Sequence, residues 1–206
     1  MTDSVKFLHS SDLQIGMTRW FLSAEAQARF DDDRIRSIER MGEVAVAHGC
    51  RFIVVAGDVF EHNSLHQQTT GRALDALRGL PVPVYLLPGN HDPLTADSIF
   101  YRMEDIDTVT VLKDTDVHEI LPGVELVGAP LLSKTATTDL VRAALEPLEP
   151  TDKIRIAVGH GQAEAHTTDA RPDLIDLAHV ESRLADGTID YLALGDTHSA
   201  EQVGDT

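Results

Sequence analysis

The chain has 206 residues, 42% of them hydrophobic and 5% aromatic, which is enough for one domain with a mainly aliphatic core. Its formal net charge is −17, so its average field repels polyanions and any nucleic-acid binding needs a local basic strip or metal ions. A single cysteine, Cys50, excludes an intrachain disulfide, and no segment approaches the roughly 20 apolar residues of a membrane-spanning helix. We therefore expect a soluble, cytoplasmic protein.

Short apolar runs alternate with segments of helical spacing, which is typical of an α/β domain. We predict helices at 23–49, 67–78, 94–104, 138–145 and 174–184. We predict strands at 5–9, within 51–58, 82–92, 154–162 and 191–198, and three more within 108–130. The fully apolar strands indicate sheets covered on both faces, and the non-alternating segment 108–130 indicates a second sheet.

Five apolar runs end in polar residues: "HSSDLQ", "AGDVF", "PGNHD", "VGHG" and "LGDTH". In four of them a glycine, which lets the backbone approach a ligand closely, directly precedes the polar residue. Open α/β sheets place their ligands at the carboxyl ends of the strands, where these residues fall. Burying so many polar groups without a cation is costly, and the mixture of oxygen and imidazole suits Mn, Fe or Zn better than Ca. The pattern predicts a metal centre.

These motifs resemble those of the calcineurin-like metallophosphoesterases, and the block "GDVFEHNSLHQQTTGRALDALRGLPVPVYLLPGNHD" with "HSSDLQIG" is most similar to the SbcD-type DNA repair exonuclease branch. The resemblance implies a four-layer α/β/β/α sandwich, possibly without its last strands, and a phosphoesterase that uses a metal-activated hydroxide. It also implies two divalent metal ions, with manganese expected first and Mg, Fe or Zn as alternatives.

The resemblance assigns a role to each matching residue. Asp58 is expected to bridge both metals, the first of which is held by Asp12, Gln14 and His198, and the second by Asn90, His160 and Asp196. His91 is expected to contact the scissile phosphate and protonate the leaving oxygen. Asp92 is expected to orient His91.

Two of these positions depart from the family pattern. Gln14 stands where the family has a first-metal histidine, and Asp196 where the exonuclease branch has a second-metal histidine. The change moves the site towards harder ions such as Mn, Mg or ferric iron. The interpretation that we favour is an altered but active site, and the alternative is a weakened first-metal position with low or lost activity.

The resemblance also bears on domains and partners. We expect residues 1–206 to form a single metallophosphoesterase domain without the C-terminal cap of the exonuclease branch. The leading hypothesis is an SbcD-like exonuclease acting on DNA ends, for which the branch implies an SbcC-like ATPase partner. The alternatives are a phosphodiesterase or phosphatase on small nucleotides or phosphoproteins, and a catalytically weak partner-binding module.

One segment, Arg19–Arg40, is rich in arginine and is the candidate basic strip. Acidic residues are interleaved with its arginines, which favours a solvated helix face over a nucleic-acid contact. Trp20 and Phe21 in the same segment either stack on a base or anchor the loop by packing, and we favour packing.

Overall fold

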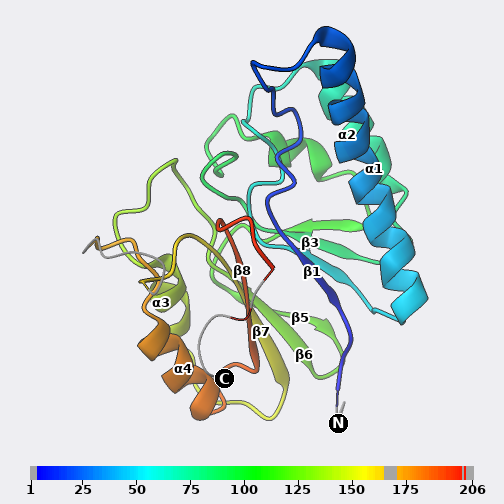
Figure 1. Cartoon of the computed structure of the whole chain (residues 1–206). Helices are drawn as coiled ribbons and strands as arrows, with labels where there is room; N and C mark the ends of the chain where they lie inside the picture. The colour runs from blue at the N-terminus through cyan, green and yellow to red at the C-terminus, as the bar shows by residue number, and fades with distance from the viewer. Residues whose placement is uncertain (1–3, 165–170, 201, 203–206) are drawn as a thin grey trace.

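The computed structural model describes residues 4–164, 171–200 and 202, and its strands form two four-stranded sheets stacked on one another (Figure 1). The first sheet has the order β1-β2-β3-β4 and is parallel throughout. The second has the order β5-β6-β7-β8, and only its β5–β6 pair is antiparallel. The strands are β1 (Leu8–Ser10), β2 (Ile53–Val55), β3 (Val84–Leu86), β4 (Val109–Val111), β5 (Val117–Leu121), β6 (Val124–Gly128), β7 (Ile154–His160) and β8 (Tyr191–Gly195).

Four α-helices and one 3₁₀ helix are present in the described part of the chain. They are α1 (Ala24–His48), α2 (Gln67–Arg78), η1 (Ile99–Met103), α3 (Leu140–Leu145) and α4 (Leu177–Ala185). α1 begins after Ser23, whose side chain accepts a hydrogen bond from the backbone N–H of Ala26, and ends at Gly49, which has a φ of 69°. The predicted ends of α1 are thereby confirmed. The predicted range of α2, 67–78, is also confirmed.

Three separate hydrophobic clusters fill the spaces between four layers. β2 divides its side chains between two of them: Ile53 and Val55 face α1 and α2, whereas Val54 faces the second sheet. The third cluster joins the outer face of the second sheet to α3 and α4, with Ala157 packed near Val180. The predicted four-layer α/β/β/α sandwich is confirmed, and α1–α2 and α3–α4 form its outer layers (Figure 1).

The helix predicted at 94–104 is wrong in extent, because only 99–103 is helical, as the 3₁₀ turn η1. The backbone N–H of Leu94 donates to Leu131 O at 2.8 Å, so the chain is tied to another loop where the helix would begin. The second sheet indicated by 108–130 is present, but only two of the three strands of this segment belong to it. β4 pairs with β3 in the first sheet, with Val109 opposite Val84, and only β5 and β6 join the second.

Three other boundaries differ from the prediction. β1 covers Leu8–Ser10 rather than 5–9. The last two helices begin later than predicted because aspartate caps fix their first turns: Asp139 accepts from Arg142 N, and Asp176 accepts from His179 N.

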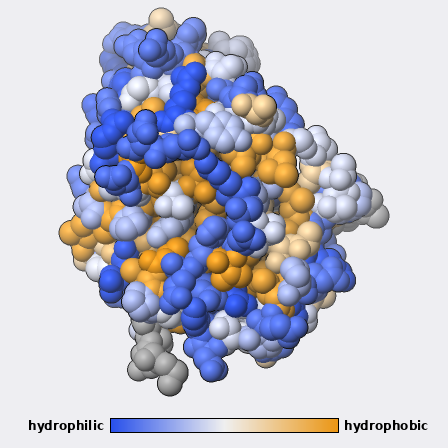
Figure 2. Space-filling view, turned by 180° about the vertical axis from the view of Figure 1, so that it is seen from behind, coloured by the Kyte–Doolittle hydropathy of each residue, from blue (hydrophilic) through white to orange (hydrophobic). Residues whose placement is uncertain are grey.

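The face opposite to that of Figure 1 carries hydrophilic residues interspersed with separate hydrophobic patches (Figure 2). Among the residues that the structure describes, no helix combines the length and apolar character needed to cross a membrane.

Candidate metal centre

The seven predicted metal ligands lie together, at the carboxyl ends of strands from both sheets. Four follow strands of the first sheet: positions 12 and 14 after β1, 58 after β2 and 90 after β3. The other three come from the second sheet, where His160 ends β7 and Asp196 and His198 follow β8. Asp12, Asp58 and His160 each offer one ligand atom, and these atoms lie within 4.8 Å of one another. The two sheets therefore share one polar centre.

His198 defines the first half of this centre. Its Nε2 lies 3.4 Å from Asp12 Oδ1 and 3.4 Å from Gln14 Nε2. Gln14 is almost fully buried, whereas His198 is exposed. These three residues are the ones that the resemblance assigns to the first metal.

His160 defines the second half. Its Nε2 lies 2.9 Å from Asn90 Oδ1, 3.4 Å from Asp58 Oδ1 and 3.8 Å from Asp196 Oδ1. Its Nδ1 lies 2.8 Å from Ala56 O, a carbonyl that only accepts, so Nδ1 carries a proton. Metal-binding histidines are oriented in the same way, by a hydrogen bond from the ring nitrogen that does not bind the ion.

The backbone at this centre is unusual. Five residues other than glycine have a positive φ in the described chain, and all five are predicted ligands: Asp12, Gln14, Asp58, Asp196 and His198. Such conformations cost of order 1–3 kcal/mol each and gather at functional sites. The strain indicates that the chain is held to present these side chains to a common point.

The glycines before the ligands are required by close contacts. A Cβ on Gly89 would lie 2.2 Å from Asp58 Oδ1, and a Cβ on Gly57 would lie 2.2 Å from His160 Nδ1. The glycines of the Gly-Asp and Gly-Asn-His-Asp motifs therefore let neighbouring strand ends pack closely together, and they also leave room for a ligand.

The donor set fits divalent cations. Asp12 Oδ1 is buried and accepts no hydrogen bond, and its nearest basic group is His198 Nε2 at 3.4 Å, so this oxygen is available to a cation. Burial alone would lower the pKa of His160, but the hydrogen bond and charge of Asp58 outweigh it and raise that pKa to about 9. Burial raises the pKa of Asp196, with further contributions from Asp12 and Asp58. Carboxylates gathered in this way require positive charge, which an imidazolium or a metal ion supplies.

His91 lies beside the centre with its side chain 37% exposed. Its backbone N–H donates to Asp58 Oδ1 at 2.9 Å, and its imidazole Nε2 lies 3.9 Å from Asp58 Oδ2. Its Nδ1 lies 3.2 Å from Glu61 O and 3.7 Å from Glu61 Oε1. Glu61 therefore orients the imidazole, a role that its position three residues after Asp58 did not reveal in the sequence.

Asp92 has a different role from the expected one. Its side chain is fully buried, and its two oxygens accept from Phe60 N and Gly89 N, each at 2.8 Å. Burial raises the pKa of Asp92 to about 7, against the opposing effect of these two hydrogen bonds. The expectation that Asp92 orients His91 is corrected: its contacts join the loops that follow β2 and β3.

A pocket of about 980 Å³ opens beside the first half of the centre. Asp12, Gln14 and His198 line it together with Arg19 and Arg34 and with apolar residues of α4 and β8. This pocket offers space for a substrate next to the predicted ligands.

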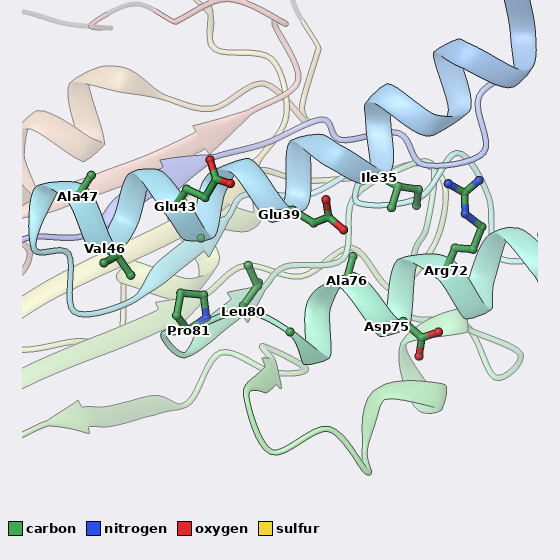
Figure 3. Close-up of a pocket in the computed structure, with 12 residues that line it drawn as sticks. Ile35, Glu39, Glu43, Val46, Ala47, Arg72, Asp75, Ala76, Leu80 and Pro81 are labelled. Carbon is green, nitrogen blue, oxygen red and sulfur yellow. The ribbon is translucent and has the colours of Figure 1, made fainter.

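A second depression, between α1 and α2, has a different character (Figure 3). It contains none of the predicted ligands. Its acids Glu43 and Asp75 form ion pairs with Arg40 and Arg78 on their own helices. Over the ranges that the structure describes, the acids of this depression are not gathered closely enough to hold a metal ion.

Replacing Gln14 by His tests the first half of the centre. We expect the variant to bind Mn²⁺ more tightly by roughly tenfold or more, because even outer-shell partners change metal affinity by 10- to 100-fold and an imidazole binds more strongly than a neutral amide. Calorimetric titration with Mn²⁺ measures this change, and Gln68→His, on the exposed face of α2, is the matched control. Equal Mn²⁺ affinity in wild type and both variants would place Gln14 outside the coordination sphere.

Comparisons with known proteins agree with this geometry. A family profile described as calcineurin-like phosphoesterase matches residues 5–200. The chain is 28% identical over 112 residues to the DNA double-strand break repair protein Mre11 of Archaeoglobus fulgidus. This match covers 52% of this chain and 24% of that protein. It is 30% identical over 100 residues to the uncharacterized metallophosphoesterase YhaO of Bacillus subtilis, covering 46% of this chain and 24% of that one.

The matched region thus spans about a quarter of the length of each of these relatives. One solved structure superposes with a TM-score of 0.51 at 15% identity, covering 96% of this chain and 86% of that chain. At this identity the likeness concerns the fold alone.

Proposed function

Because the chain belongs to the calcineurin-like phosphoesterase family, we propose that it hydrolyses phosphodiester bonds at the centre around Asp12, Asp58 and His160, as an SbcD-like exonuclease acting on DNA ends. The convergence of seven ligand-type side chains from five strand ends carries this proposal. The 28% identity to a DNA double-strand break repair protein supports a nuclease over other phosphoesterases. An SbcC-like ATPase partner is part of the same proposal.

The ligands divide between two ions. Asp12, Gln14 and His198 would hold one, and Asn90, His160 and Asp196 would hold the other, while the buried Asp58 would serve both. Two divalent cations, which we propose to be Mn²⁺, would supply Lewis-acid stabilisation of phosphate oxygens and would lower the pKa of a water towards neutrality.

The chain's own groups supply positioning and a proton. His91 is fixed through its backbone N–H on Asp58 and its Nδ1 near Glu61 O, so its Nε2 is presented at the half-exposed edge of the centre. From there it hydrogen-bonds a phosphate oxygen and gives its proton to the leaving oxygen. A positioned acid of this kind contributes typically 10²- to 10⁴-fold, so roughly that share of the rate depends on His91.

The first test is hydrolysis of bis-p-nitrophenyl phosphate with Mn, Mg, Zn and Ni added separately, and with EDTA as the metal-free control. We expect turnover that depends on Mn. End-labelled single- and double-stranded DNA then tests the substrate. Absence of hydrolysis with every metal would overturn the proposed activity, whereas hydrolysis of the small diester without any release of nucleotides from DNA would overturn the exonuclease assignment and favour a small phosphodiester substrate.

A further inference from the structure

The arginine-rich segment divides into two groups. Three of its arginines form exposed ion pairs along α1: Arg29 with Glu25, Arg36 with Asp33, and Arg40 with Glu43. The interpretation as a solvated helix face is confirmed for these three. Within residues 4–164, 171–200 and 202, by contrast, neither Arg19 nor Arg34 forms an ion pair, and both line the pocket beside the centre.

Arg34 is held in place by the loop that carries the first ligands. Its guanidinium donates to Leu13 O and lies 3.5 Å from Met17 Sδ, while its Nε is buried without a hydrogen-bond partner. Burial lowers the pKa of Arg34, and the charge of Arg19 lowers it further, whereas the charges of Glu61 and Asp31 act in the opposite direction. A guanidinium that lines a pocket without forming an ion pair is suited to bind an anion.

Arg19 is fixed through its backbone. Its N–H donates to Gln27 Oε1 at 2.9 Å, and Gln27 Nε2 donates to Met17 O at 3.0 Å, so one side chain of α1 secures both ends of this turn. The Arg19 side chain itself is exposed on a fixed support.

The two residues after Arg19 form an exposed aromatic pair. Trp20 is 95% and Phe21 64% exposed, and their rings meet edge to face with centroids 5.8 Å apart. The preference for a packed loop anchor is therefore wrong. Proteins that bind single-stranded nucleic acid combine positive charge along the backbone path with aromatic rings on which bases stack.

We propose that Arg19, Arg34 and Trp20 form a subsite for a single strand of nucleic acid, in which the guanidiniums bind the phosphate next to the scissile one and Trp20 stacks on a base. The inference rests on the proposed function and specifies its substrate. Arg19 and Arg34 line the same pocket as Asp12 and His198, so a phosphate bound by the arginines would share this pocket with one at the centre. A local cationic site is what a chain of net charge −17 needs in order to hold a polyanion.

Trp20 is the only tryptophan of the chain, so its fluorescence reports directly on this subsite. We expect titration with an eight-nucleotide oligothymidylate, in EDTA to prevent hydrolysis, to quench the emission. Arg19→Ala is expected to weaken binding roughly tenfold at low salt and to make the salt slope of log K less negative by about 0.7, the value for one lost phosphate contact on a single strand.

The matched control is Arg29→Ala, which removes the same charge from an exposed position outside the pocket. It should leave oligothymidylate binding and the hydrolysis of bis-p-nitrophenyl phosphate at wild-type values. Absence of quenching in the wild type, or equal effects of Arg19→Ala and Arg29→Ala, would overturn the subsite.

Hydrolysis separates this inference from the proposed function. We expect Arg19→Ala to lower kcat/KM for the oligothymidylate roughly tenfold more than kcat/KM for bis-p-nitrophenyl phosphate, in line with one charge-assisted phosphate contact. An unchanged ratio would overturn the subsite even if both substrates are cleaved. If neither is cleaved with any metal while the wild type still shows Arg19-dependent quenching, the subsite holds and the proposed hydrolysis fails.

Discussion

An Asp58→Asn variant is expected to lose the binding of two metal ions and to hydrolyse phosphodiesters about a thousandfold more slowly, because Lewis-acid stabilisation is worth several kcal/mol. Asp58 is 2% exposed, and its Oδ1 lies 3.4 Å from His160 Nε2. A bridging group must be anionic and have two usable oxygens, whereas the amide of Asn is neutral and has one. The variant should therefore retain at most one weakly bound ion.

Calorimetric titration with Mn²⁺ and hydrolysis of bis-p-nitrophenyl phosphate measure the two effects of Asp58→Asn. Asp33→Asn is the matched control, since it makes the same chemical change at an exposed position of α1 and should leave both values unchanged. Thermal unfolding in EDTA checks that Asp58→Asn still folds. Retention of two Mn²⁺ per chain in the folded variant would remove Asp58 from the bridging role.

His91→Ala is expected to keep both metal ions but to lose about 10²- to 10⁴-fold in turnover, the usual contribution of a positioned general acid. The substitution preserves the backbone N–H that donates to Asp58 Oδ1, so the metal ligands should remain in place. Metal content and Kd for Mn²⁺ should equal those of the wild type.

A series of aryl phosphodiesters whose leaving phenols have increasing pKa values distinguishes proton donation from simple phosphate contact. A poor leaving group needs the proton most, so the loss in His91→Ala should grow along the series. His118→Ala is the control. This half-exposed histidine lies on β5 of the second sheet and forms an ion pair with Asp114. An equal loss with every leaving group would assign His91 to binding rather than to proton transfer.

Sequence patterns predicted most of this architecture because they are local. Apolar runs of strand length, helical spacing and the cap at Gly49 identified the helices and strands, and the family resemblance supplied their arrangement in four layers. The strand-end rule also brought all seven predicted ligands to one edge, since parallel strands share the direction in which they end.

The differences arise where long-range contacts decide. The motif places Asp92 next to His91, but the backbone N–H groups of Phe60 and Gly89 that bind its carboxylate come from two different loops. The pairing of β4 with β3 and the orienting contact of Glu61 depend equally on the assembled fold. The sequence does not distinguish Arg34 from the other arginines of α1, because its contact with Leu13 O in the loop after β1 forms only in the assembled fold.

The division of the centre between the two sheets has a consequence for how the protein becomes active. A chain in which only the first sheet has formed holds Asp12, Asp58 and Asn90 but neither His160 nor His198. Such a partly folded species has no complete set of the proposed ligands for either ion. Ions that bind only the docked pair of sheets would also favour docking by mass action. Metal binding would therefore stabilise the contact between the two sheets. The proposed hydrolysis would thus require both sheets to be folded and docked.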